Sequence, residues 1–368
     1  MSGHGWIQSA RYDGVFFFGA ALLAVLTGVL VLAVPALVVP VWWLWLGLVD
    51  GPHFAATWIR TYLDRHERRT RGPLLLGSLV FWLPGFIALG LNRLLGSSAP
   101  FDAFLGFAAL WGIHHAVRQH FGIMSIYQRL GGASPQARRL DSYFLHGAMW
   151  LLFLVYLVAF PWNRTLLGLP AEPSAEEQWV VRALAATSAA VVLGYALLLV
   201  VRWRRGESLR PGLYALVVAV GTSAFAYFIV GAFEPLVPNP TNPEQLSFAV
   251  VVVGGSLHGL HYLGIIFATG RRRYGGSTED TLAARLGRAP WIAYGCLVAV
   301  SLLYLVVNAL RGASPGWAVF PYDSDMARVF LSLYWGGALH HYYLDQKIWH
   351  PRRDPVLRRE LGLADTPS

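Results

Sequence analysis

The chain has 368 residues, of which 55% are hydrophobic and 13% are charged. Soluble globular domains usually carry about 25% charged residues, so this composition argues against a soluble protein. The formal net charge of +9 does not indicate a nucleic-acid partner, because the basic residues lie in short segments between apolar stretches, as membrane orientation requires. The only cysteine, Cys296, lies within an apolar stretch, so an intrachain disulfide is excluded.

Apolar stretches of about 20 residues, long enough to cross the hydrocarbon core of a bilayer, follow one another along the chain. The first is longer than the apolar core of a signal peptide, so we expect it to remain in the protein. The loops are too short to fold separately. The sequence therefore predicts an all-α, polytopic integral membrane protein, with residues 1–368 forming a single transmembrane domain. Its ten helices are predicted at residues 14–36, 38–62, 73–92, 102–127, 142–161, 179–202, 211–233, 246–269, 289–310 and 326–348.

Basic residues follow every second predicted helix, whereas the 162–178 loop carries glutamates and almost no arginine. Cytoplasmic loops are enriched in Lys and Arg, so both termini are predicted to be cytoplasmic. The chain has 28 arginines and a single lysine, Lys347, a bias that is typical of proteins from GC-rich bacterial genomes. The predicted location is therefore the bacterial inner membrane. The basic groups are Arg60, Arg65, Arg68, Arg69 and Arg71; Arg129, Arg138 and Arg139; Arg202, Arg204, Arg205 and Arg210; Arg271, Arg272 and Arg273; and Lys347, Arg352 and Arg353.

Nine of the 12 histidines lie within the predicted helices: His146 stands apart, and the other eight are the candidate site residues. Ionisable side chains at membrane depth are costly and usually face the bundle interior, where they serve a function. These eight histidines form four clusters on the second, fourth, eighth and tenth predicted helices, at comparable distances from the cytoplasmic boundary. Scattered packing residues would not be expected to share one layer. The eight residues are His53, His114, His115, His120, His258, His261, His340 and His341.

Helical spacing brings carboxylates beside these histidines. Asp50 precedes His53 by three residues, and Asp345 follows His341 by four, so each pair shares a helix face. Adjacent histidines diverge by about 100° around a helix, so each pair points in two directions. The predicted metal ligands are therefore the eight intramembrane histidines together with Asp50 and Asp345, while no catalytic residue is assigned.

So many ligands exceed the needs of one ion, which predicts two metal ions. Imidazole suits iron, copper and zinc, and nearby carboxylates favour the harder ions. Non-haem iron is expected first, because oxygen chemistry on lipids would explain a site inside the bilayer. Copper, zinc and haem are the alternatives.

Several histidines have simpler explanations. His120 and His146 fit a helix–helix hydrogen bond as well as a ligand role. His66 and His350 lie among charged residues in predicted loops, where a solvated surface position is expected, and His4 lies near the N-terminus. Packing alone also remains an alternative for the four clusters.

The intramembrane groups H-H at 114–115 and 340–341 and H-x-x-H at 258–261 resemble those of the integral-membrane di-iron enzymes, the fatty-acid desaturases and alkane hydroxylases. The histidine-bearing bacterial β-carotene dioxygenases look similar as well. The desaturase boxes H-x-x-x-H and H-x-x-H-H are absent as such. The resemblance implies a di-iron centre that activates O₂.

These observations favour a metal-dependent membrane oxidoreductase that uses O₂ on a lipid, fatty-acyl or isoprenoid substrate entering from the bilayer. An electron-donor protein is a possible partner. A haem-binding electron carrier is the first alternative, although adjacent histidine pairs and nearby aspartates do not favour it. A metal or proton transporter is the second, although the charged groups gather at one depth and form no second gate.

Overall fold

The computed structural model describes residues 5–232, 244–311, 320 and 324–363. All regular structure in these residues is helical, which confirms the all-α prediction for them. The first helical segments are α1 (Ala10–Asp13), η1 (Gly14–Phe18), α2 (Gly19–Ala33), η2 (Pro35–Leu37), α3 (Val38–Trp45), η3 (Leu46–Asp50), α4 (Gly51–Arg60), α5 (Arg65–Gly77), η4 (Ser78–Trp82), α6 (Pro84–Leu95) and α7 (Ala99–Leu130). They are followed by α8 (Pro135–Ala159), α9 (Pro161–Leu166), α10 (Ala175–Arg204), α11 (Arg210–Leu213), η5 (Tyr214–Gly221), α12 (Thr222–Ala224), η6 (Phe225–Val230), α13 (Glu244–Tyr274), α14 (Leu282–Arg288), α15 (Pro290–Leu310), α16 (Asp325–Ile348) and α17 (Pro355–Glu360).

In the described part of the chain, eight helical stretches are long and apolar enough to cross a membrane. Each coincides with one of the predicted helices. The predicted helices at 102–127 and 326–348 are also present, as α7 and α16, but they are not among the eight. The eight stretches are Ala10–Ala33, Pro35–Arg60, Arg65–Leu95, Pro135–Ala159, Ala175–Arg204, Arg210–Val230, Phe248–Tyr274 and Pro290–Leu310.

Local sequence signals fix where several helices begin. The Ser134 hydroxyl accepts a hydrogen bond from the third residue of α8, and the proline that follows needs no donor at that position. At the start of α10, Ser174 and Glu177 form a reciprocal capping box. Ser324 caps α16 in the same way as Ser134. These caps satisfy backbone N–H groups that have no partner inside the helix.

The helix that carries His53 is irregular just before that residue. Pro52 has no N–H, so it cannot donate to the carbonyl of Leu48 one turn earlier, and its ring would crowd that carbonyl in a regular helix. Residues Leu46–Asp50 form a π-helical turn instead. The Tyr294 hydroxyl donates to the Leu48 carbonyl at 2.8 Å and replaces the missing bond.

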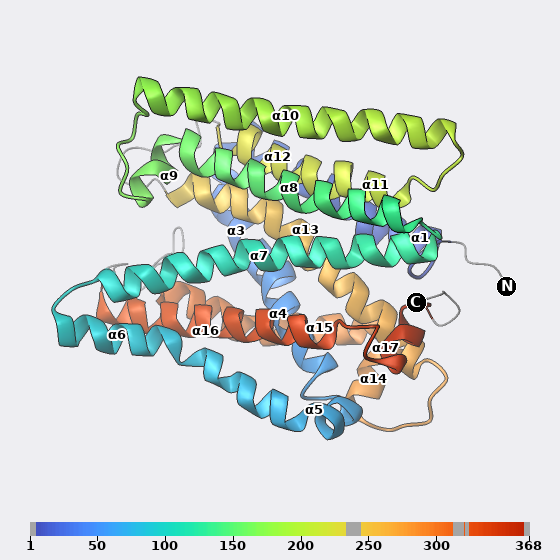
Figure 1. The fold of residues 1–368 in the computed structure, drawn as a ribbon. Coiled ribbons are helices and arrows are strands. Elements are labelled where there is room, and N and C mark those ends of the chain that lie inside the picture. Colours follow the sequence, from blue (N-terminus) through green and yellow to red (C-terminus); the bar gives the residue numbers. More distant parts are fainter. Residues whose placement is uncertain (1–4, 233–243, 312–319, 321–323, 364–368) are drawn as a thin grey trace. The chain divides into compact units, whose positions relative to one another are not determined.

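Contacts along the backbone divide the chain into two compact units. The first unit comprises residues 1–41 and 117–258, in which α8 packs along α10 (Figure 1). Buried Asp141 on α8 accepts hydrogen bonds from the Tyr195 hydroxyl at 2.7 Å and from Arg202 at 2.6 Å, both on α10. A carboxylate that is paired and fully hydrogen-bonded is tolerated in the interior, and here it fixes the register of the two helices.

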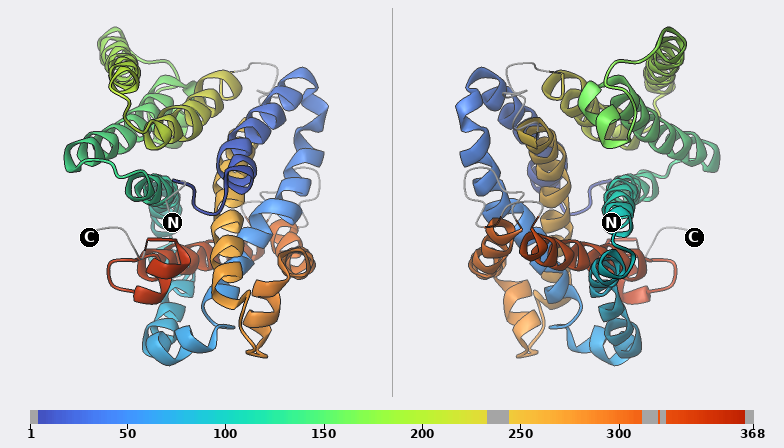
Figure 2. Two further views of the ribbon diagram at one scale, coloured as in Figure 1. Left: turned by 90° about the vertical axis from the view of Figure 1, so that its right-hand side faces the viewer. Right: turned by 90° about the vertical axis from the view of Figure 1, so that its left-hand side faces the viewer.

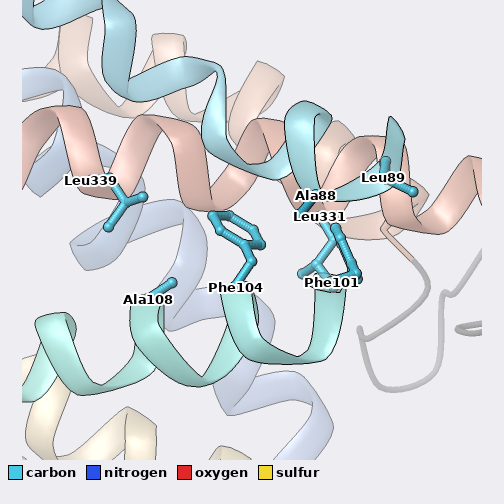
Figure 3. Close-up of a cluster of buried hydrophobic side chains, with 7 residues drawn as sticks. All are labelled: Ala88, Leu89, Phe101, Phe104, Ala108, Leu331 and Leu339. Atoms are coloured by element: carbon cyan, nitrogen blue, oxygen red, sulfur yellow. The ribbon is translucent and has the colours of Figure 1, made fainter. Parts of the chain in front are cut away.

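The second unit comprises residues 42–116 and 259–364. Within it α16 packs against α4, α6 and α15. A buried apolar cluster joins α6, α7 and α16, with the phenyl ring of Phe104 between the neighbouring helices (Figure 3). The cluster consists of Ala88, Leu89, Phe101, Phe104, Ala108, Leu331 and Leu339.

Close packing beside this cluster depends on small residues. A Cβ atom on Gly85 would lie 2.7 Å from the Cβ of Ser332, so α6 can approach α16 only because the side chain is absent.

Helix α13 is unbroken along its 31 residues (Figure 2). Its first part belongs to the first unit and its second part, from Gly259, to the second unit.

Candidate metal centre

Three histidines of the second unit converge. His53 on α4, His115 on α7 and His341 on α16 are each at most 3% exposed. The ring of His341 meets that of His53 edge-on at 4.5 Å between centroids and that of His115 at 5.1 Å. Three different helices therefore place imidazoles around one point.

His258 completes a group of four. It is the last residue of the first unit, but the unbroken α13 carries it next to Gly259 of the second unit. One ring nitrogen from each of the four histidines lies within 4.8 Å of the others. Nitrogens bound to one ion at about 2.1 Å are at most about 4.2 Å apart, so small side-chain rotations would bring these atoms onto a single ion.

His341 is the clearest candidate ligand. Its Nε2 atom is buried and has no hydrogen-bond partner among the described residues. The nearest carboxylate oxygen, Oδ2 of Asp345, is 3.6 Å away, and the same oxygen is 3.8 Å from Nε2 of His115. These distances are too long for hydrogen bonds. A buried nitrogen left without a partner is costly, and a bound cation would satisfy it.

Asp345 is held by groups on its other side. Its Oδ1 atom accepts a hydrogen bond from the Tyr262 hydroxyl at 2.8 Å. The same hydroxyl lies 2.8 Å from the Thr57 Oγ1 atom, which in turn lies 2.6 Å from Nδ1 of His341. The two nitrogens of His341 therefore have different surroundings: Nδ1 is hydrogen-bonded to Thr57, whereas Nε2 has no hydrogen-bond partner among the described residues.

Asp50 lies next to His53, one of the four histidines of the group. It accepts a hydrogen bond from the Tyr304 hydroxyl, and its Oδ1 atom is 3.9 Å from Nδ1 of His53. Asp50 and Asp345 were both predicted as metal ligands, and neither belongs to the group of four. Each instead lies next to a histidine that does.

The other predicted ligands lie outside the group. His114 is exposed, whereas its neighbour His115 is buried, as expected for adjacent residues on a helix. Nε2 of His340 lies 2.8 Å from the Tyr62 hydroxyl, and Nδ1 of His120, in the first unit, lies 3.0 Å from the Tyr214 hydroxyl. His261 is fully buried and is not a member of the group.

The histidines expected to have ordinary roles can also be placed. His66 and His350 are exposed, in agreement with a surface position. Nδ1 of His146 lies 2.9 Å from the Ser142 carbonyl within its own helix. His4 lies outside the described residues. Among the described residues, one group of metal-ligand type is found, and it consists of four histidines.

Sequence reasoning missed Thr57, and it took Tyr262 for a packing residue near the site. The signal that would have found them is a regular spacing: each of the four histidines is followed four residues later by a polar side chain on the same helix face. These pairs are His53 and Thr57, His115 and Gln119, His258 and Tyr262, and His341 and Asp345.

A site of this composition can hold a divalent transition metal. Imidazole nitrogen is a common ligand for iron, copper, zinc and nickel, and thiolate, which would indicate structural zinc, is absent because Cys296 is exposed on α15. No family model, curated protein or solved structure matches the chain. The likeness to the histidine-rich desaturases and dioxygenases therefore rests on the histidine pattern alone, and a function has to be argued from the geometry.

Proposed function

We propose that this chain is a metal-dependent membrane oxidoreductase that uses O₂ on a lipid, fatty-acyl or isoprenoid substrate. The observation that carries the proposal is the convergence of His53, His115 and His341 inside the second unit, joined by His258. Imidazoles collected at one buried point, with the Asp345 carboxylate beside two of them, have a metal ion as their natural partner.

One non-haem iron ion is the proposed cofactor. Four imidazoles close a tetrahedral zinc site, but they leave two positions open on an ion that prefers six ligands. Open positions are what a redox metal needs in order to bind O₂ next to a substrate. Iron bound here would supply electron transfer to O₂. Hydroxylation or desaturation would also need a pair of electrons from a donor protein, whereas dioxygenation would need none.

The chain's own residues would exclude water and hold the ligands in place. His115 and His341 are almost fully buried, so bulk water cannot compete for the ion. The candidate spanning helices expose many large apolar side chains, including Leu302 and Leu303 on α15. An apolar substrate can therefore reach the helix bundle through the hydrocarbon phase, which agrees with a lipid substrate.

Haem fits the group less well. Bis-histidine haem requires a porphyrin ring between two imidazoles that approach from opposite faces. The rings of His53 and His341 are only 4.5 Å apart between centroids, and the Tyr262 ring lies 5.2 Å from that of His341. This packing leaves no space for a macrocycle.

We further propose ten transmembrane helices in the bacterial inner membrane, with both termini cytoplasmic. The eight apolar stretches supply most of them. Helices α7 and α16 have sufficient length, at 32 and 24 residues, and carry the polar site. Polar residues at membrane depth are expected on helices that face a functional centre.

Neighbouring histidines provide a matched test of the metal site. His115→Ala and His341→Ala should each lower the metal content of the purified protein at least as strongly as the roughly 10–100-fold loss typical of residues that only support ligands. His114→Ala should leave it unchanged, because that side chain is exposed on the same helix. Elemental analysis per folded chain measures the effect. Full metal occupancy in both His115→Ala and His341→Ala would exclude the site.

The oxidoreductase part has a separate readout. With a chemical reductant supplied in place of the donor protein, the iron-loaded protein should consume O₂ faster when lipids extracted from its own membrane are added, and His341→Ala should show no such increase. A single tightly bound zinc ion, with no redox-active metal and no O₂ consumption, would contradict the proposed reaction and leave the metal site standing. A Soret band with stoichiometric haem would contradict the non-haem assignment.

A further inference from the structure

The polar residues that follow the histidines form a second layer behind the metal group. In the second unit, Thr57, Tyr262 and Asp345 come from three helices, α4, α13 and α16. They are at most 8% exposed, and hydrogen bonds join them into a chain that ends on His341. Buried hydroxyl groups linked in this way are rarely incidental, because each would be costly to bury alone.

The direction of these hydrogen bonds follows from the chemistry of the groups. The Tyr262 hydroxyl donates its only hydrogen to the Asp345 carboxylate. Its oxygen must then accept from Thr57, whose hydroxyl hydrogen is used in that bond. The Thr57 oxygen is left to accept, so the bond at 2.6 Å to His341 is donated by an Nδ1–H group.

We infer that Thr57, Tyr262 and Asp345 act as positioning residues, which hold His341 in the Nδ1–H tautomer so that the lone pair of Nε2 faces the metal. This inference rests on the proposed function. An imidazole can bind an ion only through a nitrogen that carries no hydrogen, and the hydrogen bond made by the other nitrogen selects the tautomer. Outer partners of this kind also fix the orientation of the ring.

Asp345 has a second part in this arrangement. Its Oδ1 atom is held by Tyr262, and its Oδ2 atom lies 3.6 Å from Nε2 of His341 and 3.8 Å from Nε2 of His115. The hydrogen bond from Tyr262 therefore sets how the negative charge faces the ligand nitrogens. A carboxylate in this position stabilises a bound cation electrostatically even when it is not itself a ligand.

The chain offers clean substitutions for each link. Tyr262→Phe keeps the aromatic ring, which packs against the rings of His53 and His341 at 5.1 and 5.2 Å, and removes only the hydroxyl. Thr57→Val keeps the shape and removes the hydroxyl, whereas Thr57→Ser restores it. Thr61→Val is the matched control, because within the described part of the chain its buried hydroxyl bonds only to the Thr57 backbone carbonyl, at 2.7 Å.

The first measurement is made on metal-free protein with ¹⁵N-labelled histidines. The His341 signals are assigned from their loss in His341→Asn. We expect a protonated Nδ1 in the wild type and in Thr57→Ser, and loss of that single tautomer in Thr57→Val. A wild-type His341 protonated at Nε2, or a spectrum unchanged in Thr57→Val, would overturn the inference without involving the metal.

The second measurement is the affinity for Co²⁺, together with its visible absorption spectrum. Thr57→Val and Tyr262→Phe should weaken binding by about 10–100-fold and shift the spectrum, and Thr57→Ser should recover both. An equal loss in Thr61→Val would mean that only packing is affected and would overturn the inference. If the wild type binds no metal, the proposed function fails, whereas wild-type binding with no effect of Thr57→Val removes only the role of the positioning residues.

Discussion

At Gly259, the absence of a side chain allows α13 to approach the segment that carries His53. A Cβ atom there would lie 2.7 Å from Cγ1 of Val49 and 3.5 Å from Cβ of His53. Valine is branched at Cβ and cannot rotate away without leaving its preferred rotamer. Gly254, on the same helix, has no atom of the described chain within 4 Å of the corresponding position.

The difference between Gly254 and Gly259 predicts opposite effects of a substitution by alanine at the two positions. Gly254→Ala should be neutral or stabilising, since alanine favours a helix over glycine by about 1 kcal/mol. Gly259→Ala gains the same amount but overpacks the contact, at a cost of about 1–3 kcal/mol, and should lower metal occupancy by displacing His53. Thermal unfolding in detergent and metal content measure both effects. Equal stability and occupancy of the two variants would show that the close contact is unimportant.

Single residues also mark how far the sequence predicts the site. Histidine clusters on four helices could be read directly, because charged and polar residues are rare in apolar helices. The choice between His114 and His115, or between His340 and His341, depends on the rotation of each helix about its axis. That rotation is set by tertiary packing, such as the contact of Gly85 with Ser332, which hydropathy does not contain.

Among the helical elements, the short α17 is held by ion pairs to arginines of three other helices, α4, α5 and α13. Arg60 on α4 pairs with Glu360 at 3.0 Å, and Arg273 on α13 lies 3.4 Å from the same carboxylate. Arg71 on α5 pairs with Asp354, the N-cap of α17, at 2.9 Å. In a buried ion pair, each charge compensates the cost of burying the other. Removing one partner therefore leaves an uncompensated buried charge, which is strongly destabilising.

Three guanidinium groups in this cluster share four carboxylates. The cluster therefore carries an excess of negative charge when all its acids are ionised. Arg272 donates a hydrogen bond to the backbone carbonyl of Glu360, at 2.9 Å. The members of the charged cluster are Arg60, Arg71, Arg273, Asp64, Glu67, Asp354 and Glu360.

The imbalance predicts unequal effects at the two ends of one ion pair. Arg60→Gln should lower the free energy of unfolding by about 3–5 kcal/mol, because it increases the excess of buried carboxylates. Glu360→Gln should cost much less, since the remaining carboxylates then match the guanidinium groups in number. Denaturant unfolding of the purified protein measures both. A loss in Glu360→Gln as large as that in Arg60→Gln would contradict the argument.

The Glu360→Gln variant should also change how the free energy of unfolding depends on pH. Burial raises the pKa of Glu360 above its ordinary value of 4.5, and Arg60 opposes this shift. A raised pKa in the folded state gives stability that is complete below the unfolded value and is lost as the pH rises through the folded value. Glu360→Gln cannot titrate, so its stability should vary less than that of the wild type as the pH rises above 4.5.

The existence and approximate ends of the long helices could be predicted from the sequence, because apolar length and Pro or Ser caps are local signals. The π-helical turn at Leu46–Asp50 was not predicted. It depends on the missing N–H of Pro52 together with a substitute donor, Tyr294, from a helix far away in sequence. The short α14 and α17, of seven and six residues, were also missed, since they are far shorter than a membrane-spanning helix and are held by tertiary contacts.

For the whole molecule, the number of membrane crossings depends on α7 and α16. Both were predicted as transmembrane helices and both are present, but neither is among the eight apolar stretches. Their polarity has a specific origin, because α7 carries His115 and α16 carries His341 and Asp345. The polar site therefore lowers the apolar content of the helices that carry it, and the alternation of arginine-rich loops is the independent signal that includes them.

The crossing of α7 can be tested directly by labelling from one side of the membrane. In a Cys296→Ala background, Ser98→Cys places a thiol just before α7, and Gln136→Cys places one just after it, both at exposed positions. If α7 spans the membrane, a membrane-impermeant maleimide applied to intact cells should label Ser98→Cys at once and Gln136→Cys only after permeabilisation. The physical reason is that Arg129, Arg138 and Arg139 hold the second loop on the cytoplasmic side. Labelling of both positions from the same side would mean that α7 does not cross, and the site would then lie near a membrane surface.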